Sequence, residues 1–187
     1  MEKLPLRPIF FVPAYLLLFV VSVSLASPKL GISNLWPWFF SLAGFALHFV
    51  WVFRALVFAS GRLRFIGRGS SGSDALRIAG RFFMMMILCF GVATLYKAYL
   101  KPVVGSVTPL DETLEMLLAL ATLYFFLGIF WISARTLCEA ELGGKATTYG
   151  TISTCLLLLN LFIGAPFIYR RLETLRELPP VRMTEPT

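Results

Sequence analysis

Three polar side chains fall inside apolar stretches of the sequence and are the first candidates for chemistry: His48, Arg54 and Asn160. Such groups are costly at membrane depth, so each marks either a functional site or a hydrogen bond between helices. His48 is the single histidine, and a haem or metal there would need another ligand, such as a methionine from residues 84–86. A neutral histidine hydrogen-bonded between helices is therefore favoured, and no cofactor is predicted.

Arg54 lies three residues beyond Trp51, towards the end of its apolar stretch. Arginine carries its charge on a long stem, so the guanidinium can extend to a membrane surface and lie close to the indole ring. A role in binding a substrate or a lipid phosphate is the alternative. Asn160 is interpreted in the same way, first as a hydrogen bond between helices and second as a transport site.

Acidic residues form two further groups. Asp111, Glu112 and Glu115 could attract a cation on the outer side, although they fit the positive end of a helix dipole equally well. Glu139 and Glu141, with nearby arginines, could serve a membrane enzyme that acts on lipid. No nucleophile–base pair accompanies them, which disfavours an enzyme. The three cysteines have neither a CxxC motif nor metal-ligand spacing.

The composition requires a membrane environment. Apolar residues make up 58% and charged residues 14% of the 187 residues, against roughly 45–50% and about 25% in soluble domains. A soluble chain of this length could not bury so much apolar surface. The net charge of +7 could indicate nucleic acid. The arginines instead cluster where hydrophobic segments end, as charges flanking membrane spans do, so no nucleic-acid partner is predicted.

The apolar runs predict an all-α, polytopic transmembrane bundle of about five spans. The spans are expected at residues 9–26, 35–59, 82–100, 115–134 and 151–169. Residues 1–178 are predicted to form one domain, and residues 179–187 a disordered tail. The first run also resembles a signal peptide, but it is longer than the usual core of such a peptide, which favours a retained helix.

The fourth segment has clear end signals. Pro109 suits the first position of a helix, and the acidic residues that follow suit its first turn. The helical pattern continues to Leu142, and Gly143 is a suitable residue to follow the last turn.

The fifth segment is compatible with two topologies. Asn160 lies in its middle, and Gly164 and Pro166 can break a helix near its end. With five spans, the Lys and Arg residues other than Arg54 number nine on the inner side and seven on the outer side; with four spans and a re-entrant segment, they number thirteen and three. The positive-inside rule favours the second, but a hairpin exposes broken backbone. Five spans are predicted, with the C-terminus translocated and residues 170–178 forming a helix on the outer surface.

Residues 61–81 are expected to be a polar connection on the cytoplasmic side, and the N-terminus is expected there too. Glycine and serine are frequent in this segment, and five arginines are expected to contact anionic lipid headgroups. They are Arg62, Arg64, Arg68, Arg77 and Arg81.

The stretch from Ile132 to Leu175 resembles the C-terminal part of small bacterial inner-membrane proteins that have no assigned chemistry. The shared features are a helix with Leu and Glu, a Gly-rich break, a Tyr, an apolar run, a Gly-x-x-aromatic motif and a basic aromatic patch. The resemblance covers under a quarter of the chain. It implies a multi-pass protein of the bacterial plasma membrane and transfers no site.

The sequence favours a non-enzymatic accessory, scaffold or sensor-like membrane protein that works through helix and lipid contacts. A small transporter or channel subunit is the first alternative, and a membrane enzyme acting on lipid is the second. The partners expected are membrane lipids and either further copies of the chain or another membrane protein.

Overall fold

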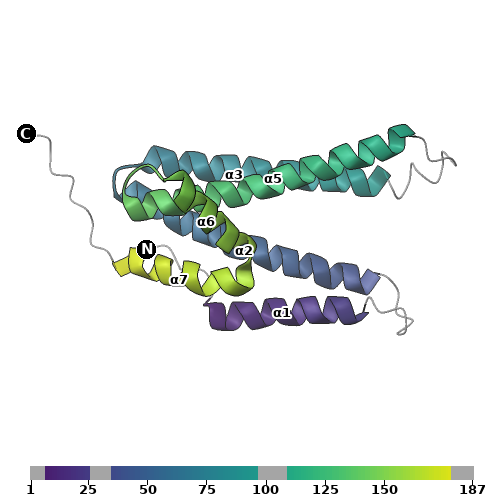
Figure 1. Cartoon of the computed structure of the whole chain (residues 1–187), viewed down its shortest axis with the longest axis horizontal. Coiled ribbons are helices and arrows are strands. Elements are labelled where there is room, and N and C mark those ends of the chain that lie inside the picture. The colour runs from purple at the N-terminus through teal and green to yellow at the C-terminus, as the bar shows by residue number, and fades with distance from the viewer. Residues whose placement is uncertain (1–6, 26–34, 97–108, 178–187) are drawn as a thin grey trace, which may run out of the picture.

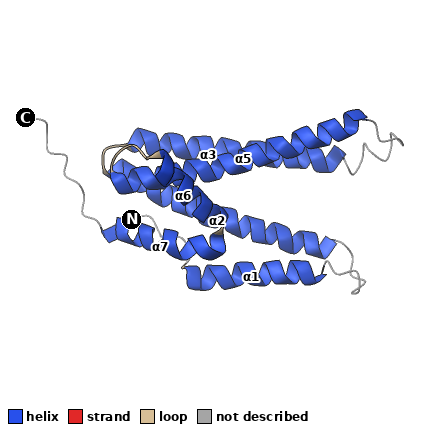
Figure 2. Ribbon diagram, in the orientation of Figure 1, coloured by secondary structure: helices blue, strands red, loops and turns tan. Residues whose placement is uncertain are grey.

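The computed structural model describes residues 7–25, 35–96 and 109–177, and these form six helices (Figures 1 and 2). They are α1 (Pro8–Leu25), α2 (Leu35–Phe65), α3 (Gly69–Leu95), α5 (Pro109–Leu142), α6 (Thr148–Leu159) and α7 (Leu161–Glu177). The prediction of an all-α fold is confirmed. The expected tail, residues 179–187, lies outside the described residues, and the single domain over 1–178 stays a prediction.

Helix α2 is the centre of the arrangement. Helices α3 and α5 pack together on one side of it, whereas α1 and α7 lie one after the other along its opposite side (Figure 1). Helix α6 passes from the end of α5 to the start of α7. With 31 and 34 residues, α2 and α5 are about 46 and 51 Å long, longer than the roughly 30 Å of a bilayer's hydrocarbon core.

Three helices of the described part are long and apolar enough to cross a membrane, so the prediction of five spans is wrong in number. They cover Ala43–Phe65, Ser70–Leu95 and Asp111–Leu142. Residues Pro8–Leu18 of α1 and the whole of α6 form shorter apolar helices. The largest difference from the prediction lies in the fifth segment, residues 151–169.

That segment is a hairpin of two helices. Helix α6 ends before Asn160, whose backbone angles of −100° and 74° are not helical, and α7 then runs back towards the end of α5 (Figure 1). The guanidinium of Arg171 in α7 accordingly donates to the Thr154 hydroxyl of α6, at 2.8 Å. The predicted transfer of residues 170–178 to the opposite side from Glu141 is therefore wrong.

The turn of the hairpin depends on a glycine. The N–H of Gly164 donates to the carbonyl of Asn160 at 2.7 Å, which closes the first turn of α7. A Cβ at Gly164 would overlap with the carbonyl oxygen of Leu157, so only glycine allows this approach. Pro166 lies inside α7, in its second turn, and has no N–H for a helical hydrogen bond there.

Residues 61–81 are also not the polar connection that was expected. Helix α2 continues to Phe65 and α3 begins at Gly69. The short turn closes with a bond from the N–H of Arg68 to the carbonyl of Leu63, 2.8 Å, and Gly67 has a φ of 80°, as in a Schellman turn. Gly72 lies directly against the backbone of Ser60. Small residues that suggest a loop here allow two helices to pack closely.

The predicted boundaries of the fourth segment are confirmed. Helix α5 begins at Pro109 with Asp111 and Glu112 in its first turn, and it ends at Leu142. Gly143 follows with a φ of 61°, the left-handed conformation that favours glycine.

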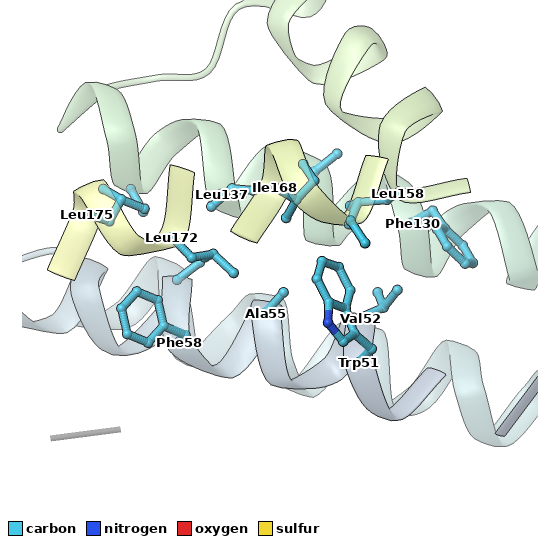
Figure 3. Packing of buried hydrophobic residues seen from close by; sticks show 14 of the residues in the cluster. Trp51, Val52, Ala55, Phe58, Phe130, Leu137, Leu158, Ile168, Leu172 and Leu175 are labelled. Carbon is cyan, nitrogen blue, oxygen red and sulfur yellow. The ribbon is translucent and has the colours of Figure 1, made fainter. Parts of the chain in front are cut away.

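The core lies between α2, the second half of α5 and the hairpin. Figure 3 shows Ile168, Leu172 and Leu175 of α7 placed over α2. Trp51 is 1% exposed and stacks on Phe11 of α1, with ring centroids 5.6 Å apart. The hairpin thus covers the half of α2 that α1 does not reach.

Replacing Gly164 with alanine tests the turn. We expect Gly164→Ala to lower the free energy of unfolding by about 1–3 kcal/mol, because the backbone of Leu157 cannot move aside cheaply. Gly91→Ala is the control, since a Cβ there would meet nothing within 4 Å. Thermal unfolding in detergent should show a lower Tm for Gly164→Ala alone. Equal Tm values for both variants would contradict the tight turn.

Candidate functional site

His48 joins the centre of α2 to the end of α6. Its side chain is only 6% exposed, and Nε2 lies 3.1 Å from the carbonyl oxygen of Leu158. A carbonyl can only accept, so Nε2 carries the hydrogen. Leu158 lies in the last turn of α6, where a helix carbonyl has no partner in its own helix. His48 therefore caps a helix end that would otherwise be buried without a donor.

Two aromatic rings hold the imidazole in place. Phe130 of α5 meets it edge-on with ring centroids 5.2 Å apart, and Tyr15 of α1 does the same at 5.8 Å. His48 thus contacts side chains or backbone of α1, α5 and α6 from its position on α2. The hydrogen bond between helices that was expected for this histidine is present.

A second polar cluster holds the hairpin to the end of α5. Arg171 donates to both carboxylate oxygens of Glu141, to the Thr154 hydroxyl at 2.8 Å and to the Cys138 thiol at 3.7 Å. The Cys138 sulfur lies 3.3 Å from the same hydroxyl. Burial lowers the pKa of Arg171, but its hydrogen bonds and charge attraction to Glu141 more than offset this and raise it.

Sequence reasoning missed this cluster because the five-span topology placed Arg171 and Glu141 on opposite sides. The side chains of the two residues are 29% and 24% exposed, so the ion pair is partly shielded from solvent. The count of Lys and Arg on the two sides of the membrane could have indicated it. That count favours a C-terminal segment that returns to the same side as the end of α5.

The other two candidates within apolar stretches do not join His48. Arg54 is exposed, whereas Trp51 is buried against Phe11, and the placement of the Arg54 guanidinium close to the indole stays a prediction. Asn160 is exposed at the turn of the hairpin, and its role there is in the backbone: its N–H donates to Leu156 at 3.0 Å. The side-chain hydrogen bond between helices that was expected for Asn160 is not seen among the described residues.

Five exposed arginines lie within about one helical turn of one another along the bundle, and we refer to them as the arginine belt. They are Arg54, Arg77, Arg81, Arg135 and Arg170. The rings of Phe49 in α2 and Phe130 in α5 are in contact, with centroids 6.1 Å apart. Arg54 and Arg135 each follow five residues later in helices that run in the same direction, so they lie at a similar position along the bundle. Phe83, next to Arg81 in the chain, contacts both Phe49 and Phe53.

The remaining belt residues follow from neighbouring contacts. Leu172 packs against α2 between Ala55 and Phe58 in Figure 3, which brings Arg170 to the same height. The contact of Phe11 with Trp51 places the first residue of α1 there as well. The belt residues therefore come from four helices, α2, α3, α5 and α7.

Surface chemistry changes at the belt. From Leu35 to Phe53, α2 rises about 28 Å, and on this side the exposed side chains are mainly apolar, as are Val50, Met84 and Leu123. On the other side, exposed charges such as Arg64 and Glu173 lie among exposed apolar side chains such as Phe65. This second side is called the basic end below.

Three of the arginines predicted to contact lipid lie in the basic end. Arg62 stacks on Phe65 with its guanidinium carbon 5.6 Å from the ring centroid, Arg64 is exposed, and Arg68 precedes α3. Arg77 and Arg81 belong to the belt. Sequence reasoning missed the other three belt residues as a group, because they come from helices distant in sequence.

At the opposite end, the hydroxyl of Tyr96 donates to the carboxylate of Asp111, which links the end of α3 to the start of α5. This hydrogen bond raises the pKa of Tyr96 to about 12. Within the described ranges, no three His, Cys, Asp or Glu side chains lie close enough to hold a metal ion.

Comparison with known proteins finds no family model, no curated protein and no solved structure that matches this chain.

Replacing His48 with phenylalanine isolates its hydrogen bond, because the ring contacts can be kept. We expect His48→Phe to cost about 1–3 kcal/mol of unfolding free energy, since the carbonyl of Leu158 loses its donor. Hydrogen exchange should increase around residues 157–164 and stay unchanged in α3. His48→Gln, which keeps a donor, should recover part of the loss. Native-like exchange in His48→Phe would show that the bond is dispensable.

The ion pair can be measured by a double-mutant cycle with Glu141→Gln and Arg171→Gln. We expect a coupling free energy of about 1–2 kcal/mol, between the values for exposed and buried charged hydrogen bonds. The exposed pair Arg77–Asp74, 2.8 Å apart within α3, is the control, with an expected coupling of about 0.2–0.5 kcal/mol. Equal couplings for the two pairs would mean that Arg171 does not fix the hairpin.

Proposed function

We propose that this chain is a multi-pass protein of the bacterial inner membrane with a non-enzymatic, scaffold-like role. In this proposal α2, α3 and α5 cross the bilayer together with the shorter α1, whose 18 residues are just long enough to span. The α6–α7 hairpin re-enters the bilayer from the cytoplasmic side. The bacterial setting rests on the resemblance of the 132–175 stretch. The apolar surface on one side of the belt supports the membrane placement. This surface extends about 28 Å along α2, which is close to the thickness of a hydrocarbon core.

The distribution of charge supports a cytoplasmic basic end. Five of the 17 Lys and Arg residues fall outside the described ranges. The other twelve lie at the belt or in the basic end, whereas Asp111, Glu112 and Glu115 lie at the opposite end. Cytoplasmic segments carry the excess of positive charge in membrane proteins. We infer that the N-terminus and the basic end face the cytoplasm.

The exposed face of α7 supports re-entry of the hairpin. Ile163 and Phe167 are both 59% exposed, while Arg170 and Glu173 are the exposed residues that follow. From Arg170 back to Leu161 the helix rises about 13 Å. The turn would therefore lie within the hydrocarbon region, where broken backbone is tolerated only if protein covers it. His48 provides such cover.

One observation carries the scaffold-like role: the buried polar groups described here are engaged in holding helices together. His48 binds the end of α6, and Thr154 and Cys138 bind Arg171. Glu141, the residue best placed to act on lipid, is already paired with Arg171. A rigid bundle with a fixed hairpin suits a protein that positions partners or lipids.

A transporter or channel subunit is the second candidate. Its support is the hairpin itself, since helix ends beside a polar side chain at membrane depth form ion sites in transporters. Proton flux into proteoliposomes distinguishes the two proposals. We expect flux no greater than in protein-free liposomes. A flux that the native protein supports and His48→Phe abolishes would replace the scaffold proposal with a transport function.

The topology has its own test in intact cells. We expect a cysteine at Ser71 to react with a membrane-impermeant maleimide only after permeabilisation, and a cysteine at Glu112 to react without it, because both side chains are exposed at opposite ends. The native chain is the blank for its own three cysteines. A fluorescent C-terminal fusion should be bright and a phosphatase fusion inactive. Labelling of Ser71→Cys from outside would reverse the orientation.

A further inference from the structure

A shallow, open groove on α3 crosses the arginine belt. Its lining consists of Arg77, Gly80, Arg81, Met84 and Met85, which lie on one face of the helix because they are three or four positions apart. A Cβ at Gly80 would meet nothing within 4 Å, so the glycine leaves open space at the floor of the groove. The groove is charged at one end and apolar at the other.

The charged end of the groove lies at the arginine belt, and its apolar end lies on the apolar side of the belt. Arg77 and Arg81 are belt residues, whereas Met84 and Met85 are exposed one turn further into the apolar side, at 65% and 44%. A ligand that fits must carry an anionic group joined to an apolar chain. Methionine is flexible and polarisable, so its side chains can adapt to such a chain.

We propose that this groove binds one anionic phospholipid. The phosphate accepts hydrogen bonds from the guanidinium groups of Arg77 and Arg81, and an acyl chain lies over Gly80 and along the two methionines. Arg77 also donates to Asp74 at 2.8 Å, but that pair is well exposed and such pairs contribute little. A guanidinium has five N–H donors, so the remaining ones are available to the phosphate.

This site rests on the proposed membrane placement and makes it more specific. Of the five arginines that sequence reasoning assigned to lipid, only Arg77 and Arg81 lie at the belt. Arg64, in the basic end, would project past the headgroups. Lipid binding should therefore depend on position along α3 and not on the number of arginines near the turn.

Filling the groove is the first test. Gly80→Leu places a side chain on its floor, and Gly91→Leu places the same side chain at an equally open position of α3 away from the arginines. The protein is released into the gas phase from micelles that contain phosphatidylglycerol or phosphatidylcholine, and retained lipids are counted by native mass spectrometry. We expect the native chain and Gly91→Leu to retain one phosphatidylglycerol more than phosphatidylcholine, and Gly80→Leu to lose that lipid.

Removing one charge is the second test. We expect Arg81→Gln to weaken phosphatidylglycerol binding about fivefold, the loss of one arginine near an anionic headgroup, while Arg64→Gln binds as the native chain does. Unchanged Tm values check that the variants are folded. Equal effects of Arg81→Gln and Arg64→Gln, or equal retention of the two lipids, would overturn the site. Displacement of the lipid by inorganic phosphate alone would also overturn it, since the acyl chain would then contribute nothing.

The two proposals can fail separately. If maleimide labelling reverses the orientation, the cytoplasmic placement of the basic end fails while the groove keeps its chemistry. If the labelling is as expected and Gly80→Leu still retains the phosphatidylglycerol, only the lipid site is wrong.

Discussion

The carbonyl oxygen of Leu158 imposes the constraint on which the rest of the fold depends. Helix α6 ends one residue later, and the last carbonyls of a helix have no partner in their own helix. Such a group costs free energy in a buried position unless a donor reaches it. His48 supplies the donor, and Tyr15 and Phe130 hold its ring from two further helices. The hydrogen bond therefore sets how deeply the hairpin sits against α2.

Once that depth is set, the length of α7 determines what its other end can reach. Ten residues separate Leu161 from Arg171, which is about 15 Å of helix. This distance brings the guanidinium to Glu141 and Thr154 at the end of α5. It also places the change from apolar to charged surface, between Phe167 and Arg170, at the height of the belt. A single position of α7 along α2 thus satisfies the packing, the ion pair and the boundary between apolar and charged surface.

Sequence reasoning succeeded where the determinants are local and failed where they are distant. Pro109, the acidic first turn and Gly143 act within a few residues, so both ends of α5 could be predicted. Gly164 and Pro166 indicate that a break near Asn160 is possible, but the donor that stabilises it lies 110 positions away from its acceptor, so the local pattern could not decide between the two topologies. His48 could be recognised as a buried polar group, but its acceptor could not. The arginine belt and the cluster around Arg171 likewise join helices that are far apart in the sequence.

A straight helix over residues 148–177 is the competing structure, and its costs explain the hairpin. It would satisfy the carbonyl of Leu158 internally but leave the imidazole of His48 buried without its acceptor, a loss comparable to the bond gained. It would also carry Arg171 about 30 Å from Glu141 and break a bidentate, partly shielded pair. The close contact at Gly164 would disappear as well. The hairpin loses about one turn of helical hydrogen bonds. In exchange it gains the bond of His48 to Leu158, the close contact at Gly164 and the ion pair of Arg171, which hold it at successive positions along the bundle.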